Sequence, residues 1–190
     1  MSNAPPDYME TQRSVNLGHS NGLVENDDDG ALALDFVEWV EESELSFDSI
    51  LVVGCRTGYE VSFFRAHWDS ASIIGVDIVP EFVKQANRRG RPALVADMHA
   101  LPFEDGLFDL VFCVGTLEHA YDAPRVVREM KRVARRAVFC DAELETPASH
   151  LNASNLTFIS DPQVWASMFQ GPPWNVDWKQ ASDSAYIWAW

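Results

Sequence analysis

The sequence has only three cysteines, and none of them belongs to a CxxC pair. Cys55, Cys113 and Cys140 each lie in or beside an apolar run that resembles a strand. Thiols in such runs are usually small buried side chains, whereas disulfide frameworks and zinc sites need several cysteines at close, paired spacings. The sequence therefore predicts neither, and we expect no metal at the functional site.

Long hydrophobic runs are also missing. No apolar run approaches the roughly 18 residues that a membrane-spanning helix needs. The first residues, MSNAPPDYME, have neither the basic start nor the apolar stretch of a secretory signal. We therefore expect a cytoplasmic protein that has no membrane partner. No feature of the sequence indicates an oligomeric state.

Basic residues are scarce, because 14 Lys and Arg stand against 29 Asp and Glu, giving a net charge of −15. An acidic protein repels phosphate backbones, so the charge argues against a nucleic-acid partner. One segment is an exception, and its basic members are Arg125, Arg128, Lys131, Arg132, Arg135 and Arg136. We interpret this base-rich segment as the solvated face of a helix.

What the sequence does contain is a long alternation of apolar and amphipathic segments. Residues 1–30 are polar and predict a flexible arm or lid, with a short helix near residues 8–15. Residues 31–190 are expected to form a single domain that begins with an amphipathic helix at residues 31–43. Further helices are expected at residues 60–68, 80–89, 122–134 and 161–169.

Apolar runs predict strands at residues 49–53, 72–78, 93–96, 109–115 and 137–141. Strands that are apolar throughout are typical of a parallel sheet covered by helices on both faces. Two more strands, at residues 174–179 and 185–190, must pair antiparallel because the connection between them is short. The predicted fold class is α/β, a doubly wound and mostly parallel sheet that ends in an antiparallel hairpin.

The residues that follow the predicted strands carry the chemistry, since ligands of an open α/β sheet bind at the carboxyl ends of its strands. The glycine loop GCRTG, Gly54 to Gly58, follows the first strand and leads into a helix whose N-terminus can face an anionic group. Asp77 ends the second strand, where an acid can accept hydrogen bonds from both ribose hydroxyls. Asp97 and Met98 follow the third strand and could bind the edge of a base.

Together these residues describe a pocket for an adenosine that bears a charged tail, as in NAD or S-adenosylmethionine. The dinucleotide fingerprint G-x-G-x-x-G requires glycine where this chain has Arg56 and Tyr59. The sequence therefore disfavours NAD.

Four segments resemble class I S-adenosylmethionine-dependent methyltransferases of the small-molecule branch that includes ubiquinone- and sterol-type enzymes. They are ILVVGCRTG, IIGVDIVPEFVKQA, LVADMHALPFEDGLFDLVFCVGTLEH and DAPRVVREMKRVARRAVF, in the family's order over about residues 49–140. The resemblance implies a Rossmann-like, seven-stranded sheet with a reversed last strand. It also implies S-adenosylmethionine as cofactor and methyl transfer to a small-molecule acceptor.

The resemblance assigns the first two strand ends to the cofactor. Gly54, Cys55 and Gly58 would line its methionine end. Asp77 would bind the ribose, and Ile78 would pack on the adenine.

The next two strand ends would complete the site. By the same resemblance, Asp97 and Met98 would read the adenine edge, and Val114 and Gly115 would lie beneath the sulfonium. His119, just past the fourth strand, is the candidate general base, because imidazole titrates near neutral pH. The alternative is that His119 packs and forms hydrogen bonds at the start of the next helix.

Two positions in the first segment depart from the family pattern. Val52 replaces a usual acidic residue, and Arg56 replaces a usual glycine. Arg56 could swing outward, pair with the cofactor carboxylate or fill the pocket.

These departures leave two hypotheses. The first is an active methyltransferase that acts on a small metabolite, and the second is a methyltransferase-like protein without catalysis that acts as a binding or regulatory partner. A nucleic-acid methyltransferase is less favoured, because Gly115-Thr116-Leu117-Glu118 stands where an N/D-P-P-Y/F motif would follow the fourth strand.

Overall fold

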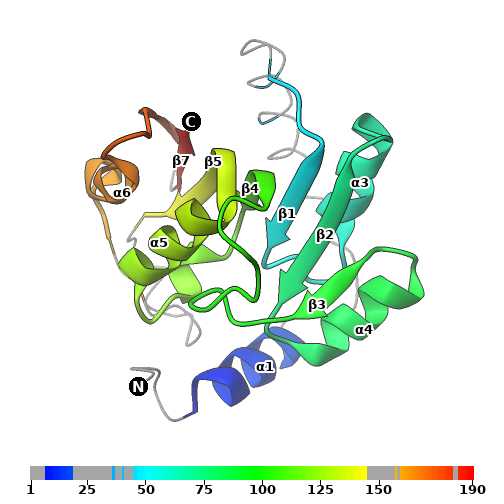
Figure 1. Ribbon diagram of the computed structural model, residues 1–190. Coiled ribbons are helices and arrows are strands. Elements are labelled where there is room, and N and C mark those ends of the chain that lie inside the picture. Colours follow the sequence, from blue (N-terminus) through cyan, green and yellow to red (C-terminus); the bar gives the residue numbers. More distant parts are fainter. Residues whose placement is uncertain are drawn as a thin grey trace.

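The computed structural model describes residues 7–18, 36, 40, 45–144, 157, 159–181 and 184–190. Within this part of the chain, one seven-stranded sheet has the strand order β3-β2-β1-β4-β5-β7-β6. The order reverses between β1 and β4, which therefore flank the switch point of the sheet. Figure 1 shows the twisted sheet with helices packed against it.

Five strands run parallel, and they are β1 (Ser49–Val53), β2 (Ser72–Asp77), β3 (Ala93–Val95), β4 (Phe108–Cys113) and β5 (Ala134–Glu143). The last two, β6 (Val176–Ala181) and β7 (Ser184–Ala189), pair antiparallel with each other, and β7 also pairs antiparallel with β5. This confirms the predicted α/β class, the mostly parallel sheet and the C-terminal hairpin.

β5 is longer than the sequence predicts, because it begins at Ala134 and not at residue 137. Helix α5 (Ala123–Val133) ends immediately before it, and Ala134 is already extended, with φ −82° and ψ 136°. The side chain of Arg135 donates to Asp109 Oδ1 on β4 at 2.6 Å. This ion pair joins the two strands at their start.

The other helices are α1 (Tyr8–Gly18), α3 (Tyr59–His67), α4 (Pro80–Arg88), the short 3-10 helix η1 (Leu117–His119) and α6 (Pro162–Phe169). Side chains cap two of the helices: Asp122 accepts from Arg125 N at 3.0 Å, and Asp161 accepts from Gln163 N at 2.8 Å. The expected helix at residues 31–43 lies almost wholly outside the described residues. At the two positions described there, Phe36 and Val40, the backbone is helical and the side chains are buried.

The sheet has an apolar core on each face, as a doubly wound sheet requires. Successive residues of β1 point to opposite faces, so Val52 joins the core that contains Phe64 while Val53 joins the core that contains Met130. Figure 1 shows α5 and α6 beside β4, β5 and β7, and α3 and α4 beside β1, β2 and β3. No helix in the described part of the chain is long and apolar enough to cross a membrane.

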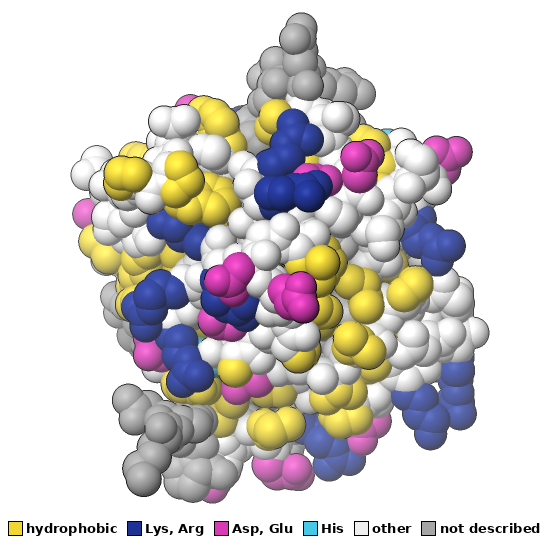
Figure 2. All heavy atoms as spheres, viewed as in Figure 1, with side chains coloured by type: hydrophobic (Ala, Val, Ile, Leu, Met, Phe, Trp, Pro, Cys, Tyr) yellow, Lys and Arg dark blue, Asp and Glu magenta, His cyan; other side chains and the backbone are white. Residues whose placement is uncertain are grey.

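The base-rich segment is more than a solvated helix face. Arg132 donates to Asp105 and Glu129, each at 2.8 Å, and Lys131 Nζ donates to the carbonyl of Phe169 at 2.8 Å. These contacts join α5 to the loop before β4 and to the end of α6. Figure 2 shows Lys and Arg side chains interspersed with acidic ones on the face in view, and not gathered into one basic surface.

Candidate functional site

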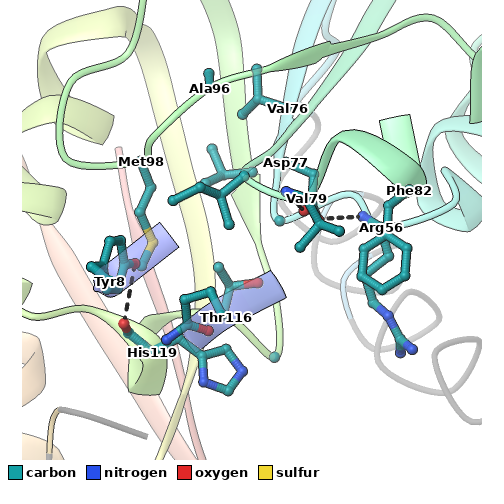
Figure 3. Close-up of a pocket in the computed structure, with 15 residues that line it drawn as sticks. Tyr8, Arg56, Val76, Asp77, Val79, Phe82, Ala96, Met98, Thr116 and His119 are labelled. Carbon is teal, nitrogen blue, oxygen red and sulfur yellow. Dashed lines mark hydrogen bonds between the residues drawn. The ribbon is translucent and has the colours of Figure 1, made fainter. Parts of the chain in front are cut away.

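A pocket opens at the carboxyl ends of the parallel strands, beside the switch point between β1 and β4 (Figure 3). Its empty space amounts to about 550 Å³ when the open solvent at its mouth is included. Seven of the predicted site residues line it: Gly54, Arg56, Asp77, Ile78, Met98, Gly115 and His119. The structure therefore brings together residues from four separate strand ends.

Asp77 is the most fully engaged polar residue of this pocket. Its side chain is 7% exposed, Oδ1 accepts from Val79 N at 2.8 Å, and Oδ2 accepts from Arg56 N at 2.8 Å. Burial raises the pKa of this carboxyl, and the two backbone N–H groups act against that rise. Each carboxylate oxygen has a second lone pair, so Asp77 can still accept hydrogen bonds from a ligand's hydroxyl groups.

Gly54 allows a close approach that no other residue would permit. Its φ is 74°, and a Cβ placed there would lie 2.0 Å from Thr116 Oγ1. Thr116 itself donates through Oγ1 to Val114 O at 2.9 Å and lines the pocket. The sequence did not single out Thr116, because nothing local indicates that it crosses over the glycine loop.

Arg56 also has a left-handed backbone, with φ 45°. Glycine adopts this conformation freely, whereas a residue with a Cβ is strained there by roughly 1 kcal/mol or more. Its guanidinium carbon lies 5.7 Å from the centre of the Phe82 ring. Figure 3 shows the side chain running past Phe82 on the side of the pocket away from Met98. Arg56 therefore lies along the rim and does not fill the pocket.

Four predicted residues do not line the pocket: Cys55, Gly58, Asp97 and Val114. Cys55 is 0% exposed and faces the sheet, where a Cβ on Gly75 would come 2.5 Å from its sulfur. Burial raises the pKa of the Cys55 thiol, as expected for a packed and unreactive sulfur. Val114 packs against the core on the α3 side of the sheet.

Gly58 lies on the side of the glycine loop that packs against Arg91. It is the N-cap of α3 with φ 82°, and a Cβ placed there would lie 2.9 Å from Arg91 Cβ. Arg91 donates to Thr57 O at 3.1 Å, which holds the same turn. Gly58 thus lets the turn pack closely against Arg91, and it does not face the pocket.

The Asp97 carboxylate is hydrogen-bonded to His99. Asp97 Oδ1 accepts from His99 N at 2.9 Å and lies 2.6 Å from His99 Nδ1. Partial burial acts to raise the pKa of Asp97, but the hydrogen bonds from His99 lower it on balance. The carboxylate therefore fixes the loop after β3, while the next residue, Met98, faces the pocket.

Val52 lies outside the pocket as well. Its side chain is 2% exposed and belongs to the core that contains Phe64 and Phe112. Val52 therefore contributes to the core and not to the pocket lining.

Helix α1 forms a wall of the pocket through Tyr8 and Gln12. The Tyr8 hydroxyl donates to His119 O at 3.2 Å, and its ring makes edge contacts with His99 and Tyr121 at 5.5 and 4.8 Å between ring centres. Burial raises the pKa of the Tyr8 phenol. His19, which belongs to the arm or lid predicted over residues 1–30, lies outside the described residues.

The middle of α1 is tied to α4 by an ion pair, because Arg13 Nη2 lies 2.6 Å from Glu81 Oε1 at the start of α4. The sequence indicates the helix, and the structure confirms it. Its position over the pocket depends on contacts across more than sixty residues, for which the sequence carries no spacing signal. Figure 1 shows α1 beside α4, at the edge where the parallel strands end.

The remaining pocket residues are mainly apolar. Beyond those already placed, the lining consists of Val53, Val76, Val79, Phe82 and Ala96. Such an apolar wall suits the flat face of a base, and Asp77 stands next to it as an acceptor for hydroxyl groups. Among the described residues, no group of three or more His, Cys, Asp or Glu is arranged to hold a metal ion.

Residues 51–140 match the family model described as "Methyltransferase domain". This chain carries a class I S-adenosylmethionine-dependent methyltransferase domain. The match spans β1 to β5 and contains every strand end that contributes to the pocket. Of the described elements that line the pocket, α1 alone lies outside this match.

Curated relatives are similar to part of the chain. The malonyl-[acyl-carrier protein] O-methyltransferase of Halorhodospira halophila is 37% identical over 89 residues, which cover 44% of this chain and 30% of the relative. The ajmaline N-methyltransferase of Rauvolfia serpentina is 34% identical over 125 residues, covering 62% and 42%. The chain thus spans less than half of either relative.

Solved structures share the fold over almost the whole chain. An S-adenosylmethionine-dependent methyltransferase from Aquifex aeolicus aligns with a TM-score of 0.64 at 14% identity and covers 98% of both chains. The [4+2]-cyclase SpnF aligns with a TM-score of 0.72 at 17% identity, covering 98% of this chain and 97% of that one. At these identities the likeness shows the fold alone.

The cofactor of this family, S-adenosylmethionine, fits the residues of the pocket. Asp77 offers a buried carboxylate to the ribose, and Ile78, Val79 and Phe82 offer apolar surface to the adenine. Arg56 offers a cation on the rim, where the cofactor's carboxylate could meet it.

Proposed function

We propose that the protein transfers a methyl group from S-adenosylmethionine to a small-molecule acceptor. The observation that carries the proposal is the Asp77 carboxylate. It is buried at the end of β2, held by two backbone N–H groups, and set beside an apolar wall at the switch point. An acid in that position, within a methyltransferase domain, is suited to bind the two ribose hydroxyls of the cofactor.

Different residues of the pocket would bind different parts of the cofactor. Asp77 would hold the ribose, Ile78 and Phe82 would exclude water from the base, and Arg56 would pair with the carboxylate of the amino-acid tail. When bound, the cofactor supplies an electrophilic methyl group on a sulfonium. The chain's contribution is then mainly to place the acceptor in line with that group.

His119 is the candidate base for an acceptor that must lose a proton. It lines the pocket, its Nε2 lies 3.7 Å from Glu118 Oε1, and its backbone carbonyl holds Tyr8. An imidazole can take up a proton near neutral pH. The role of His119 in catalysis is a proposal that rests on this position.

A second candidate function is binding or regulation without catalysis. Two observations favour it: Arg56 is strained where the family has glycine, and α1 is seated over the pocket.

Incubation with methyl-labelled S-adenosylmethionine and a fractionated cell extract would separate these functions. We expect label in the small-molecule fraction, and Asp77→Asn should lower the rate. Saturable cofactor binding without any transfer of label would favour the second candidate. Label in the protein or nucleic-acid fraction would contradict a small-molecule acceptor.

A further inference from the structure

Two buried carboxylates lie directly behind the pocket wall. Glu118 in η1 is 8% exposed, and Asp141 near the end of β5 is 6% exposed. We refer to them as the carboxylate pair. Neither was singled out as a site residue by its position in the sequence.

The carboxylate pair is attached to the pocket at two points. Asp141 Oδ1 accepts from Gly115 N at 2.6 Å, and Gly115 lines the pocket. Glu118 stands between two other lining residues, Thr116 and His119. The pair therefore lies next to the end of the pocket formed by the residues that follow β4, opposite the end formed by Asp77 and Phe82 (Figure 3).

Glu118 has an oxygen that the described residues leave unsatisfied. Its Oε2 is buried and has no hydrogen-bond partner there, while Oε1 lies 3.7 Å from His119 Nε2, beyond hydrogen-bond range. A buried polar atom without a partner destabilises the fold, so such atoms usually mark a place that another group occupies. For a carboxylate oxygen, that group is a hydrogen-bond donor or a cation.

The acidic groups around the carboxylate pair favour a cation as the partner of Glu118 Oε2. Burial raises the pKa of Glu118 to about 7, and the nearby Glu143 contributes. Burial, and then the charge of Glu118, raise the pKa of Asp141 to about 8. The other titratable groups that act on this place are His119 on η1 and the buried thiols of Cys113 and Cys140. Near neutral pH, the pair must therefore keep a proton or bind a positive group.

We propose that the carboxylate pair binds the protonated amine of the methyl acceptor and takes up its proton. This inference rests on the proposed function and narrows the acceptor to a basic primary or secondary amine. An N–H bond of the ammonium breaks, an O–H bond forms at Glu118, and the electron pair stays on nitrogen as the lone pair that a nucleophile needs. A carboxyl whose pKa has moved toward that of an amine makes this transfer less unfavourable.

The inference is tested with two probes that have the same skeleton, phenethylammonium and 2-phenylethanol. Each is titrated calorimetrically into the full chain saturated with S-adenosylhomocysteine, in two buffers of different ionisation enthalpy. We expect the ammonium to bind at least about tenfold more tightly than the alcohol and to release a proton from the pair. Equal affinity for the two probes would overturn the inference.

Three variants make the test specific. Glu118→Gln keeps the shape without the charge and should abolish the preference for the ammonium, whereas Glu104→Gln, an exposed acid, should retain it. If Glu118→Gln fails to fold, Asp141→Asn provides the same readout. A preference unchanged in Glu118→Gln or its substitute would contradict the inference.

The binding of S-adenosylhomocysteine is measured first, which keeps the two proposals separable. Its absence would count against the proposed function. Equal probe affinities in the saturated protein would count against the amine acceptor alone.

Discussion

Arg56 shows how one residue can alter a shared loop without dismantling it. Its N–H donates to Asp77, as the backbone of a glycine could, so the hydrogen bond that ties β1 to β2 does not depend on its side chain. The side chain adds a guanidinium on the rim beside Phe82. The substitution therefore changes the charge at the entrance and leaves the floor of the pocket in place.

We expect Arg56→Met to weaken binding of S-adenosylhomocysteine about tenfold, because it removes one charged partner of the carboxylate. Binding of 5′-methylthioadenosine, which lacks the amino-acid tail, should change little. Calorimetric titration of both ligands measures the difference. Tighter binding of S-adenosylhomocysteine by the variant would show instead that Arg56 obstructs the site.

The carboxylate pair should make stability depend on pH. Because the folded-state pKa values of Glu118 and Asp141 are raised to about 7 and about 8, the folded state keeps protons that the unfolded chain releases. Stability should therefore be highest near pH 5 and fall as the pH rises toward 8, with a slope of at most about 1.4 kcal/mol per pH unit for each proton.

Thermal melting across this range measures the dependence, and Glu118→Gln should flatten it. The acids whose pKa values are lowered, such as Asp97 and Asp109, act on the acidic side of the window and do not mask it. A wild-type melting temperature that rises from pH 5 to 8 would show that the carboxylate pair does not control the pH dependence of stability.

A site residue could be predicted from the sequence when its position depends only on the strand that it follows. Asp77 and Met98 were predicted because Asp77 ends β2 and Met98 lies in the loop that follows β3, and ligands of an open α/β sheet bind at the carboxyl ends of its strands. Cys55 and Asp97 do not line the pocket, because Cys55 fills the space over Gly75 and Asp97 is bonded to a histidine two residues away. No motif reports such contacts.

Helix α1 is the element whose position matters most for access to the pocket. It is held at its first residue by Tyr8, which contacts His99, Tyr121 and His119, and at its middle by the ion pair between Arg13 and Glu81. An exposed ion pair stabilises by no more than about 1 kcal/mol, so the aromatic contacts of Tyr8 should dominate. We propose that α1 acts as a lid.

Tyr8→Ala should release this lid, and we expect faster association and faster dissociation of S-adenosylhomocysteine. Hydrogen exchange of the amides in residues 8–18 should accelerate at least about tenfold, because a buried aromatic contributes 3 kcal/mol or more. Met9→Ala, which changes an exposed neighbour on the same helix, is the control. Equal exchange in the two variants would show that α1 does not depend on Tyr8.

Most elements could be predicted because each satisfies a local rule. Buried strands read as apolar runs, and Asp122 and Asp161 mark the starts of α5 and α6 through their capping hydrogen bonds. The early start of β5 was missed, because Arg135 and Arg136 do not resemble residues of a buried strand. Their side chains reach Asp109 and the carbonyl of Ser46, which the sequence alone cannot indicate.

At the scale of the whole molecule, the net charge of −15 bears on the partner. Basic side chains that would contact phosphates are in part committed to internal contacts, as Arg132 and Arg135 show. We expect no salt-dependent shift in fluorescence anisotropy when the protein is added to a labelled RNA or DNA duplex at low ionic strength. Binding that weakened steeply with salt would overturn this expectation.

The central claim is that the pocket at the strand ends binds S-adenosylmethionine, and calorimetric titration tests it most directly. We predict saturable binding with one site per chain at submillimolar concentration. Asp77→Asn should bind about tenfold to a hundredfold more weakly, because a charge-assisted acceptor is lost from the ribose. No detectable binding by the folded wild-type protein at millimolar cofactor would contradict the account.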